Sequence, residues 1–132
     1  MKDQIYCVKQ TEHGNGLFAK REIEPGETIY VRPEGQVYTR EELQRDERRT
    51  DHFLQVGRDM FVFIPYPAHC LNHSCAPNAR IVGNRTIAMR GICIGEEVTI
   101  DYSTFMGPDW TMSCGCGSPD CKMVIQGRAN YK

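Results

Sequence analysis

The stretch Asn72-His73-Ser74-Cys75-Ala76-Pro77-Asn78 lies in the middle of the chain and is denser in polar groups than a core strand should be. Its asparagine and histidine side chains can pair with a purine edge, a carboxylate or an ammonium. Taken alone, the stretch favours a buried histidine with satisfied hydrogen bonds over a binding site. Its chemistry therefore depends on what the rest of the chain places beside it.

Three cysteines near the end of the chain lie in the run Cys114-Gly115-Cys116-Gly117-Ser118-Pro119-Asp120-Cys121. Thiolates this close together, among glycine and proline turn residues, suit a tetrahedral zinc site. A closed zinc site needs four ligands, and Cys75 is the best donor of the fourth. We therefore predict one structural zinc ion, which would fold the tail over the segment of Asn72 and His73. The predicted ligands are Cys75, Cys114, Cys116 and Cys121.

The other three cysteines, Cys7, Cys70 and Cys93, lie in apolar, strand-like surroundings. Cysteine in such surroundings behaves as a small hydrophobic residue. We predict that all three are inert core residues.

The composition is that of one small globular domain. The chain has 132 residues, of which 40% are hydrophobic and 25% charged, with a formal net charge of −1. We expect no direct nucleic-acid binding, which usually needs a basic bias, and no membrane span, which needs ~18 or more apolar residues. The first residues lack the apolar run of a signal peptide, so we expect a soluble, intracellular protein.

The hydrophobic pattern predicts a mostly β domain with one or two helices. Expected strands cover residues 4–9, 17–19, 28–31, 59–64 and 97–102, with a hairpin over residues 79–89. His13-Gly14-Asn15-Gly16 is a predicted tight turn, because glycine and asparagine tolerate positive φ. Glu96 and Glu97 are predicted to be solvated, since adjacent strand residues face opposite ways.

A capping box, Thr39 with Glu42, begins the best helix candidate, over residues 40–49. Leu43 is its only large apolar residue, so we interpret it as a solvated helix and not as a binding surface. The acids of residues 40–59 could select a basic peptide, although Arg45, Arg48 and Arg49 largely offset their charge.

Four motifs occur in order between residues 13 and 121. The first joins Gly14-Asn15-Gly16-Leu17-Phe18-Ala19 to Ile23-Glu24-Pro25-Gly26-Glu27, and the second is the stretch from Asn72 to Asn78. The third runs from Gly95 to Tyr102, and the last is the cysteine run. Together they resemble the SET-domain protein lysine methyltransferases with a post-SET zinc motif. We expect a small stand-alone member of that family.

The resemblance implies a mainly β (α+β), β-clip-like fold of small sheets with a pseudoknot. It divides the chain into a SET domain, residues 1–110, and a zinc-bound post-SET tail, residues 111–132. It implies that Tyr102 is the catalytic tyrosine and lines the substrate channel with Ile100. The residues implied to bind S-adenosylmethionine are His13, Gly14, Asn15, Gly16, Asn72 and His73.

Several features depart from the family pattern. Cys70 and Leu71 stand where an Arg-Phe pair is frequent, and a second family tyrosine cannot be assigned to Tyr30 or Tyr38. Ile100 stands where a larger Phe or Tyr often limits how many methyl groups fit. We therefore predict di- or trimethylation.

The implied function is methylation of a lysine in a protein substrate, a histone or another basic protein, with S-adenosylmethionine as cofactor. The alternative is a catalytically silent SET module that binds a peptide without methylating it. The sequence does not distinguish a monomer from a homodimer. The expected location is nuclear in a eukaryote, and cytoplasmic or host-directed if the source is bacterial or viral.

Overall fold

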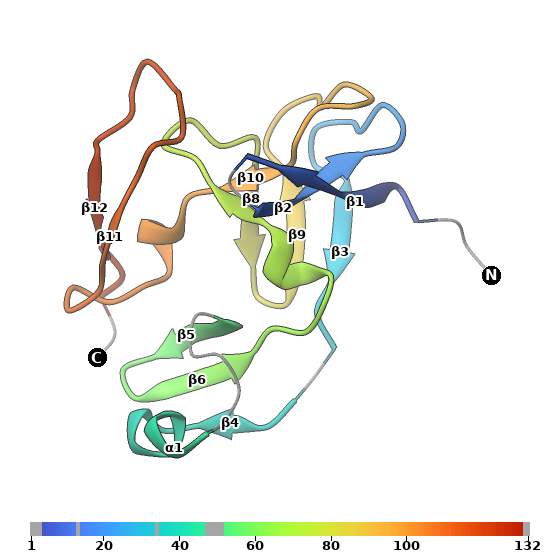
Figure 1. Cartoon of the computed structure of the whole chain (residues 1–132). Coiled ribbons are helices and arrows are strands. Elements are labelled where there is room, and N and C mark those ends of the chain that lie inside the picture. Colours follow the sequence, from blue (N-terminus) through green and yellow to red (C-terminus); the bar gives the residue numbers. More distant parts are fainter. Residues whose placement is uncertain (1–3, 13, 34, 47–51, 131–132) are drawn as a thin grey trace.

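The computed structural model describes residues 4–12, 14–33, 35–46 and 52–130, and the fold is mainly β, as predicted (Figure 1). The strands within these residues pair into small sheets of two or three strands. The strands are β1 (Tyr6–Thr11), β2 (Gly14–Ala19), β3 (Thr28–Val31), β4 (Val37–Tyr38), β5 (Phe53–Gly57), β6 (Met60–Phe63), β7 (Asn72–His73), β8 (Ala79–Val82), β9 (Arg85–Ala88), β10 (Thr99–Ile100), β11 (Thr111–Ser113) and β12 (Val124–Gln126).

The antiparallel hairpin β1–β2 packs on the main core. Leu17 of β2 is buried there with Ile23, Ile92 and Val98. The predicted turn over residues 13–16 is wrong in its extent, because Gly14 already pairs with Thr11 and belongs to β2. The chain therefore reverses before Gly14, and His13 lies outside the described residues.

The pseudoknot is a short parallel pair, β7 with β10, in which Asn72 lies opposite Thr99 and His73 opposite Ile100. Parallel strands need a long crossover connection. Here the connection contains the predicted hairpin, β8–β9, which extends β3 into a three-stranded sheet. The predicted strand over residues 97–102 is wrong in its length, since only Thr99–Ile100 is strand and a 3-10 turn begins at Tyr102.

A second layer consists of α1 (Arg40–Arg45) and the sheet β4–β6–β5, which lies below the other sheets in Figure 1. The Thr39–Glu42 capping box is present as predicted, and Leu43 buries its side chain against Phe53 and Phe61. The helix ends at Arg45 with Asp46 as its C-cap, short of the predicted residue 49. Residues 47–49 lie outside the described part of the chain.

The C-terminal segment forms the antiparallel pair β11–β12, which lies at one side of the molecule (Figure 1). Ile125 of β12 is buried, whereas Met123 and Val124 are exposed. Within the described residues, no helix has the length and hydrophobicity needed to span a membrane.

Candidate active site and cysteine cluster

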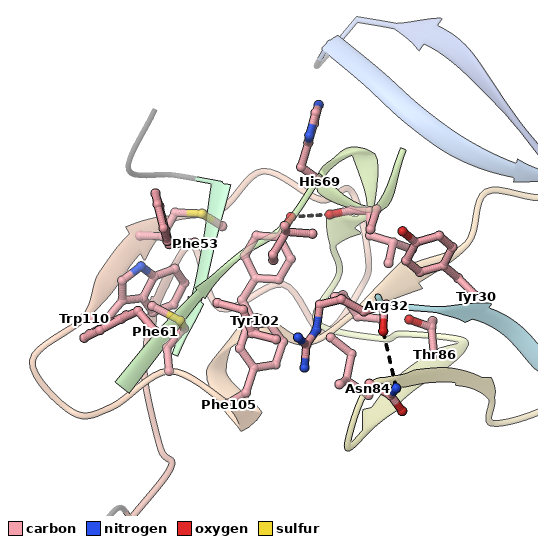
Figure 2. Close-up of a pocket in the computed structure, with 18 of the residues that line it drawn as sticks. Tyr30, Arg32, Phe53, Phe61, His69, Asn84, Thr86, Tyr102, Phe105 and Trp110 are labelled. Carbon is pink, nitrogen blue, oxygen red and sulfur yellow. Dashed lines mark hydrogen bonds between the residues drawn. The ribbon is translucent and has the colours of Figure 1, made fainter. Parts of the chain in front are cut away.

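Tyr102 forms hydrogen bonds through its backbone and through its hydroxyl to two residues around the start of the central motif, Leu71 and His73. Its backbone N–H donates to Nδ1 of His73 at 3.0 Å, and its hydroxyl donates to the carbonyl oxygen of Leu71 (Figure 2). Asp101 precedes the turn and caps it by accepting from the N–H of Ser103 at 3.0 Å. The parallel β7–β10 pair thus fixes where the phenol lies, because Tyr102 follows β10 by two residues and Leu71 precedes β7 directly.

The side chain of His73 is buried, with 2% exposed, and hydrogen-bonds to two different parts of the chain. Burial lowers its pKa, against the opposing effect of Asp101, whose carboxylate oxygen lies 3.7 Å from Nδ1. A neutral ring with an acceptor at Nδ1 carries its proton on Nε2. That nitrogen lies 3.4 Å from Sγ of Cys75. His73 therefore joins the Tyr102 turn to the cysteine cluster.

Asn72 joins β7 to the start of β2. Its Nδ2 donates to the backbone carbonyl of Asn15 at 3.0 Å and to Oε2 of Glu97 at 2.8 Å. The prediction that Glu97 is merely solvated is therefore wrong, because the parallel strand brings its carboxylate to Asn72. A Cβ at Gly16 would lie 2.6 Å from the same carboxylate, so a side chain there would have to displace Glu97 from Asn72.

A largely apolar cavity of about 500 Å³ lies beside Tyr102, between the two layers and the tail. In Figure 2, Tyr102 and Phe105 lie in the middle of the view, with the lining residues Trp110, Phe53 and Phe61 on one side and Tyr30 and Thr86 on the other. Ile100, which is 4% exposed, is part of the wall. Of the two tyrosines that the sequence could not distinguish, Tyr30 lines the cavity and Tyr38 packs edge-on against Phe53 in the second core.

The four cysteines predicted as zinc ligands lie together, with their Sγ atoms all within 4.8 Å of one another. A tetrahedral site with Zn–S distances of ~2.3 Å has sulfur–sulfur edges of ~3.8 Å. The Cys75 and Cys114 sulfurs are 3.9 Å apart, close to that edge, so the donor set and its spacing are compatible with a zinc ion. In the thiol cluster, burial and neighbouring thiols raise the pKa of Cys114 to about 12.

The same cluster contains a thiol that ionises easily. Burial opposes ionisation of Cys116, but hydrogen bonds from backbone groups at Cys75 and Ser118 lower its pKa to about 6. A preformed thiolate is a ready first metal ligand. Of the remaining cysteines, Cys70 is buried as predicted, whereas Cys93 is exposed, so the prediction that Cys93 is a core residue is wrong. Cys93 lies in the loop before β10, where the apolar neighbours along the sequence do not enclose it.

Sequence reasoning missed the contacts that close the tail onto the Tyr102 turn. Arg128 donates from its backbone N–H to the carbonyl of Ser103 at 2.7 Å and from Nη2 to Asp101 at 3.2 Å. Its Nε donates to the Ser103 hydroxyl at 3.1 Å. No local signal marks Arg128, because its partners lie about 25 residues earlier in the chain.

The arrangement that decides the family is a parallel β7–β10 pair that carries a buried histidine and delivers a tyrosine to the edge of an apolar cavity. Comparison with family descriptions matches residues 14–103 to the SET domain. The chain belongs to the SET-domain family. The predicted family membership is confirmed. The predicted boundary near residue 110, between the SET domain and the post-SET tail, stays a prediction.

Curated relatives of this SET domain are about 30% identical to it. They include "Histone-lysine N-methyltransferase trithorax" of Drosophila virilis, 30% identical over 94% of this chain and 4% of its own length. Another is "Histone-lysine N-methyltransferase, H3 lysine-36 specific" of Candida albicans, 32% identical over 92% of this chain and 16% of its own length. The chain thus spans only a small part of these relatives.

The fold has a solved counterpart in the methyltransferase domain of human Histone-lysine N-methyltransferase SETMAR. The two superpose with a TM-score of 0.70, over 92% of this chain and 58% of the other, at 22% sequence identity. This similarity shows a shared fold.

Proposed function

We propose that this SET domain transfers methyl groups from S-adenosylmethionine to a lysine side chain of a protein substrate. The observation that carries the proposal is the position of Tyr102. Its hydroxyl, paired with the Leu71 carbonyl, stands at the wall of an apolar cavity whose other lining residues come from parts of the chain that lie far apart in the sequence. Membership of the family and the names of its relatives, which are histone-lysine N-methyltransferases, support the same reaction.

The apolar cavity suits a lysine that has to lose its proton. Only a neutral amine is nucleophilic, and at pH 7 a lysine with a pKa of ~10.4 is neutral in about one molecule in 2,500. Burial in an apolar environment lowers that pKa. The oxygens of Tyr102 and Leu71, two residues that line the cavity, would then orient the amine, which contributes to the rate by alignment.

The cofactor would bind beside the start of β2, on the residues that Asn72 draws together. Gly14 and Asn15 are exposed there, and Asn72 fixes the Asn15 backbone through its side-chain amide. His13, Gly16 and His73 complete the proposed binding residues. When bound, S-adenosylmethionine supplies a methyl group on a sulfonium, a leaving group that departs as a neutral thioether.

The zinc ion is proposed to be structural. All four ligands are thiolates from this chain, which leaves no coordination position for substrate or water. Its role would be to hold the tail against the Tyr102 turn.

The size of Ile100 supports the proposal that the product is di- or trimethyl lysine. An isoleucine in the cavity wall is smaller than an aromatic residue and leaves room for a methylated amine to rotate. Histones are the first substrates to test, because they appear in the names of the relatives. A histone substrate implies a nuclear location.

The test is transfer of labelled methyl from S-adenosylmethionine to core histones and to a whole-cell lysate, comparing the native chain with Tyr102→Phe. We expect incorporation into lysine, reduced about 100-fold or more in the variant, as for the loss of one oriented donor at a reacting centre. Equal incorporation by both proteins contradicts the role of Tyr102. Binding of peptide and cofactor without incorporation favours the silent binding module.

A further inference from the structure

The large cavity beside Tyr102 has a charge pattern that the family assignment does not explain. Its lining contains two arginines, Arg32 and Arg40, and within the described residues it contains no aspartate, glutamate or lysine. A groove built for an arginine- and lysine-rich peptide would be expected to carry carboxylates. The fixed charges that the described lining residues bring to this cavity are instead positive.

Arg32 extends from the end of β3 into the cavity. Its backbone is fixed, because its N–H donates to the carbonyl of Asn84 at 2.7 Å and its own carbonyl accepts from Nδ2 of Asn84 at 3.3 Å. Figure 2 shows the guanidinium on the side that faces Tyr102 and Phe105. Among the described residues this guanidinium has no hydrogen bond or ion pair. Arg32 is a half-buried residue, and its charge has no protein partner within the described part of the chain.

Arg40 places a second positive charge at the same cavity. Its guanidinium carbon lies 5.1 Å from the ring centroid of Phe61, so the charge is held over an aromatic face. The carboxylate of Asp59 accepts from the Arg40 backbone N–H at 2.7 Å, which is a helix-end contact and not an ion pair with the side chain.

Two of the acids that could have selected a basic peptide, Glu41 and Glu42, interact with residues of their own segment. Glu41 pairs with Arg45 at 2.6 Å, and Glu42 accepts from the Thr39 backbone N–H at 2.9 Å as part of the capping box. Glu47 and Asp51 lie outside the described residues. Glu41, Glu42 and Asp59 thus each have a partner other than the guanidinium groups of Arg32 and Arg40.

We propose that Arg32 binds a carboxylate side chain of the substrate close to the target lysine. The inference rests on the proposed lysine methylation and names its substrate class, which is a lysine flanked by aspartate or glutamate and not a wholly basic tail. A carboxylate is the natural partner of a planar guanidinium, and such pairs are strong when partly removed from water. Arg40 adds to the attraction. The same positive charges disfavour protonation of a lysine entering the cavity.

The experiment compares peptides that share one central lysine in a neutral background, with both ends capped to remove terminal charges. A single glutamate, glutamine or arginine is placed at each position within about three residues, or ~10 Å of extended chain, on either side. kcat/KM for methyl transfer is measured for the native chain, Arg32→Gln and Arg32→Glu. Equilibrium binding of the same labelled peptides to each protein gives a readout independent of catalysis.

Arg80→Glu is the matched control, because Arg80 is exposed on β8 and lies on the opposite face from Ile81, which lines the cavity. The native chain should prefer the best glutamate peptide over its glutamine counterpart by about tenfold, as expected for a charge-assisted hydrogen bond. Arg32→Gln should lose this preference, and Arg32→Glu should prefer arginine instead. Arg80→Glu should behave as the native chain.

Peptides that are methylated and bound equally well whatever their flanking charge overturn the inference and leave the proposed function intact. A glutamate preference that persists in Arg32→Glu overturns it as well. If no peptide is methylated, the proposed function fails. The inference is then decided by whether the native chain binds the glutamate peptide more tightly than the glutamine peptide, and whether Arg32→Gln loses that difference.

Discussion

Asn78 shows how one side chain can hold the pseudoknot together. It is 2% exposed, its Nδ2 donates to the carbonyl of Glu97 at 2.8 Å, and its Oδ1 accepts from the N–H of Thr99 at 2.9 Å. The side chain therefore satisfies the backbone of the segment that leads into β10. Because Tyr102 follows β10, Asn78 supports the position of the phenol without touching it.

We expect Asn78→Ala to lower the free energy of unfolding by ~2–4 kcal/mol, since it leaves a buried donor and a buried acceptor without partners. Urea denaturation monitored by fluorescence measures the change. Gln44→Ala, on the exposed face of α1, is the control and should change stability by less than ~0.5 kcal/mol. A loss below ~1 kcal/mol for Asn78→Ala would mean that water replaces the amide at little cost.

Ile100 is the residue at which product size should be decided, because it is buried in the cavity wall beside Tyr102. Ile100→Phe should reduce the space for a methylated amine and shift the main product from di- or trimethyl to monomethyl lysine. Mass spectrometry of a peptide after exhaustive reaction gives the distribution. Ile100→Val adds no side-chain volume to the cavity wall and should leave the product distribution unchanged. A native product that stops at one methyl group contradicts the prediction.

At the scale of elements, the C-terminal segment reaches the Tyr102 turn through a close backbone approach. Gly127 donates to the carbonyl of Trp110 at 2.9 Å, and a Cβ at Gly127 would collide with the backbone oxygens of Gly107 and Met106. Gly107 is itself held by Gln55, whose Oε1 accepts its N–H at 2.7 Å. The tail, the Tyr102 turn and the second layer therefore meet at one glycine pair.

Gly127→Ala should displace the segment after β12 and lower the free energy of unfolding by ~2–3 kcal/mol, because backbone atoms cannot move aside easily. Amide hydrogen exchange should rise at residues 124–129, and methyl transfer should fall with it. Gly115→Ala is the matched control, since nothing lies within 4 Å of its Cβ position. Unchanged exchange in Gly127→Ala would show that the tail is not held by this approach.

At the scale of the whole molecule, the cysteine cluster connects the centre of the chain to its end. Cys75 follows β7, and the other three thiols lie between β11 and β12. The backbone N–H of Lys122 also points to the Cys75 sulfur, at 3.4 Å. A metal here closes a long loop around the core, so its binding free energy adds to the stability of the tertiary structure.

Zinc analysis should find one ion per chain, and its removal by a strong chelator should lower the melting temperature and abolish methyl transfer together. Cys121→Ser should lose most of the zinc, because three thiolates and a hydroxyl bind it less well. Cys93→Ser, which changes an exposed cysteine outside the cluster, should keep one zinc ion. A Cys121→Ser protein with full zinc content would exclude this cysteine as a ligand.

The local patterns of the sequence were sufficient for much of this description. Contiguous motifs identified the family, the Thr39–Glu42 box marked the helix start, and cysteine spacing with one added thiol grouped the four sulfurs. These features depend on residues a few positions apart, or on a metal-ligand count. The strands β3, β8 and β9 were predicted for the same reason, because alternation and turn residues are local signals.

Only the tertiary structure decided which distant residues share the site. Long-range packing pairs β7 with β10 and brings Glu97 to Asn72. It also brings Arg128 to Asp101, and it places Tyr30 rather than Tyr38 at the cavity. Two-residue strands carry no periodicity that a sequence can reveal. The charge of the cavity likewise emerges only when Arg32 and Arg40 are brought together from separate layers, while the acids around Arg40 form contacts within their own segment.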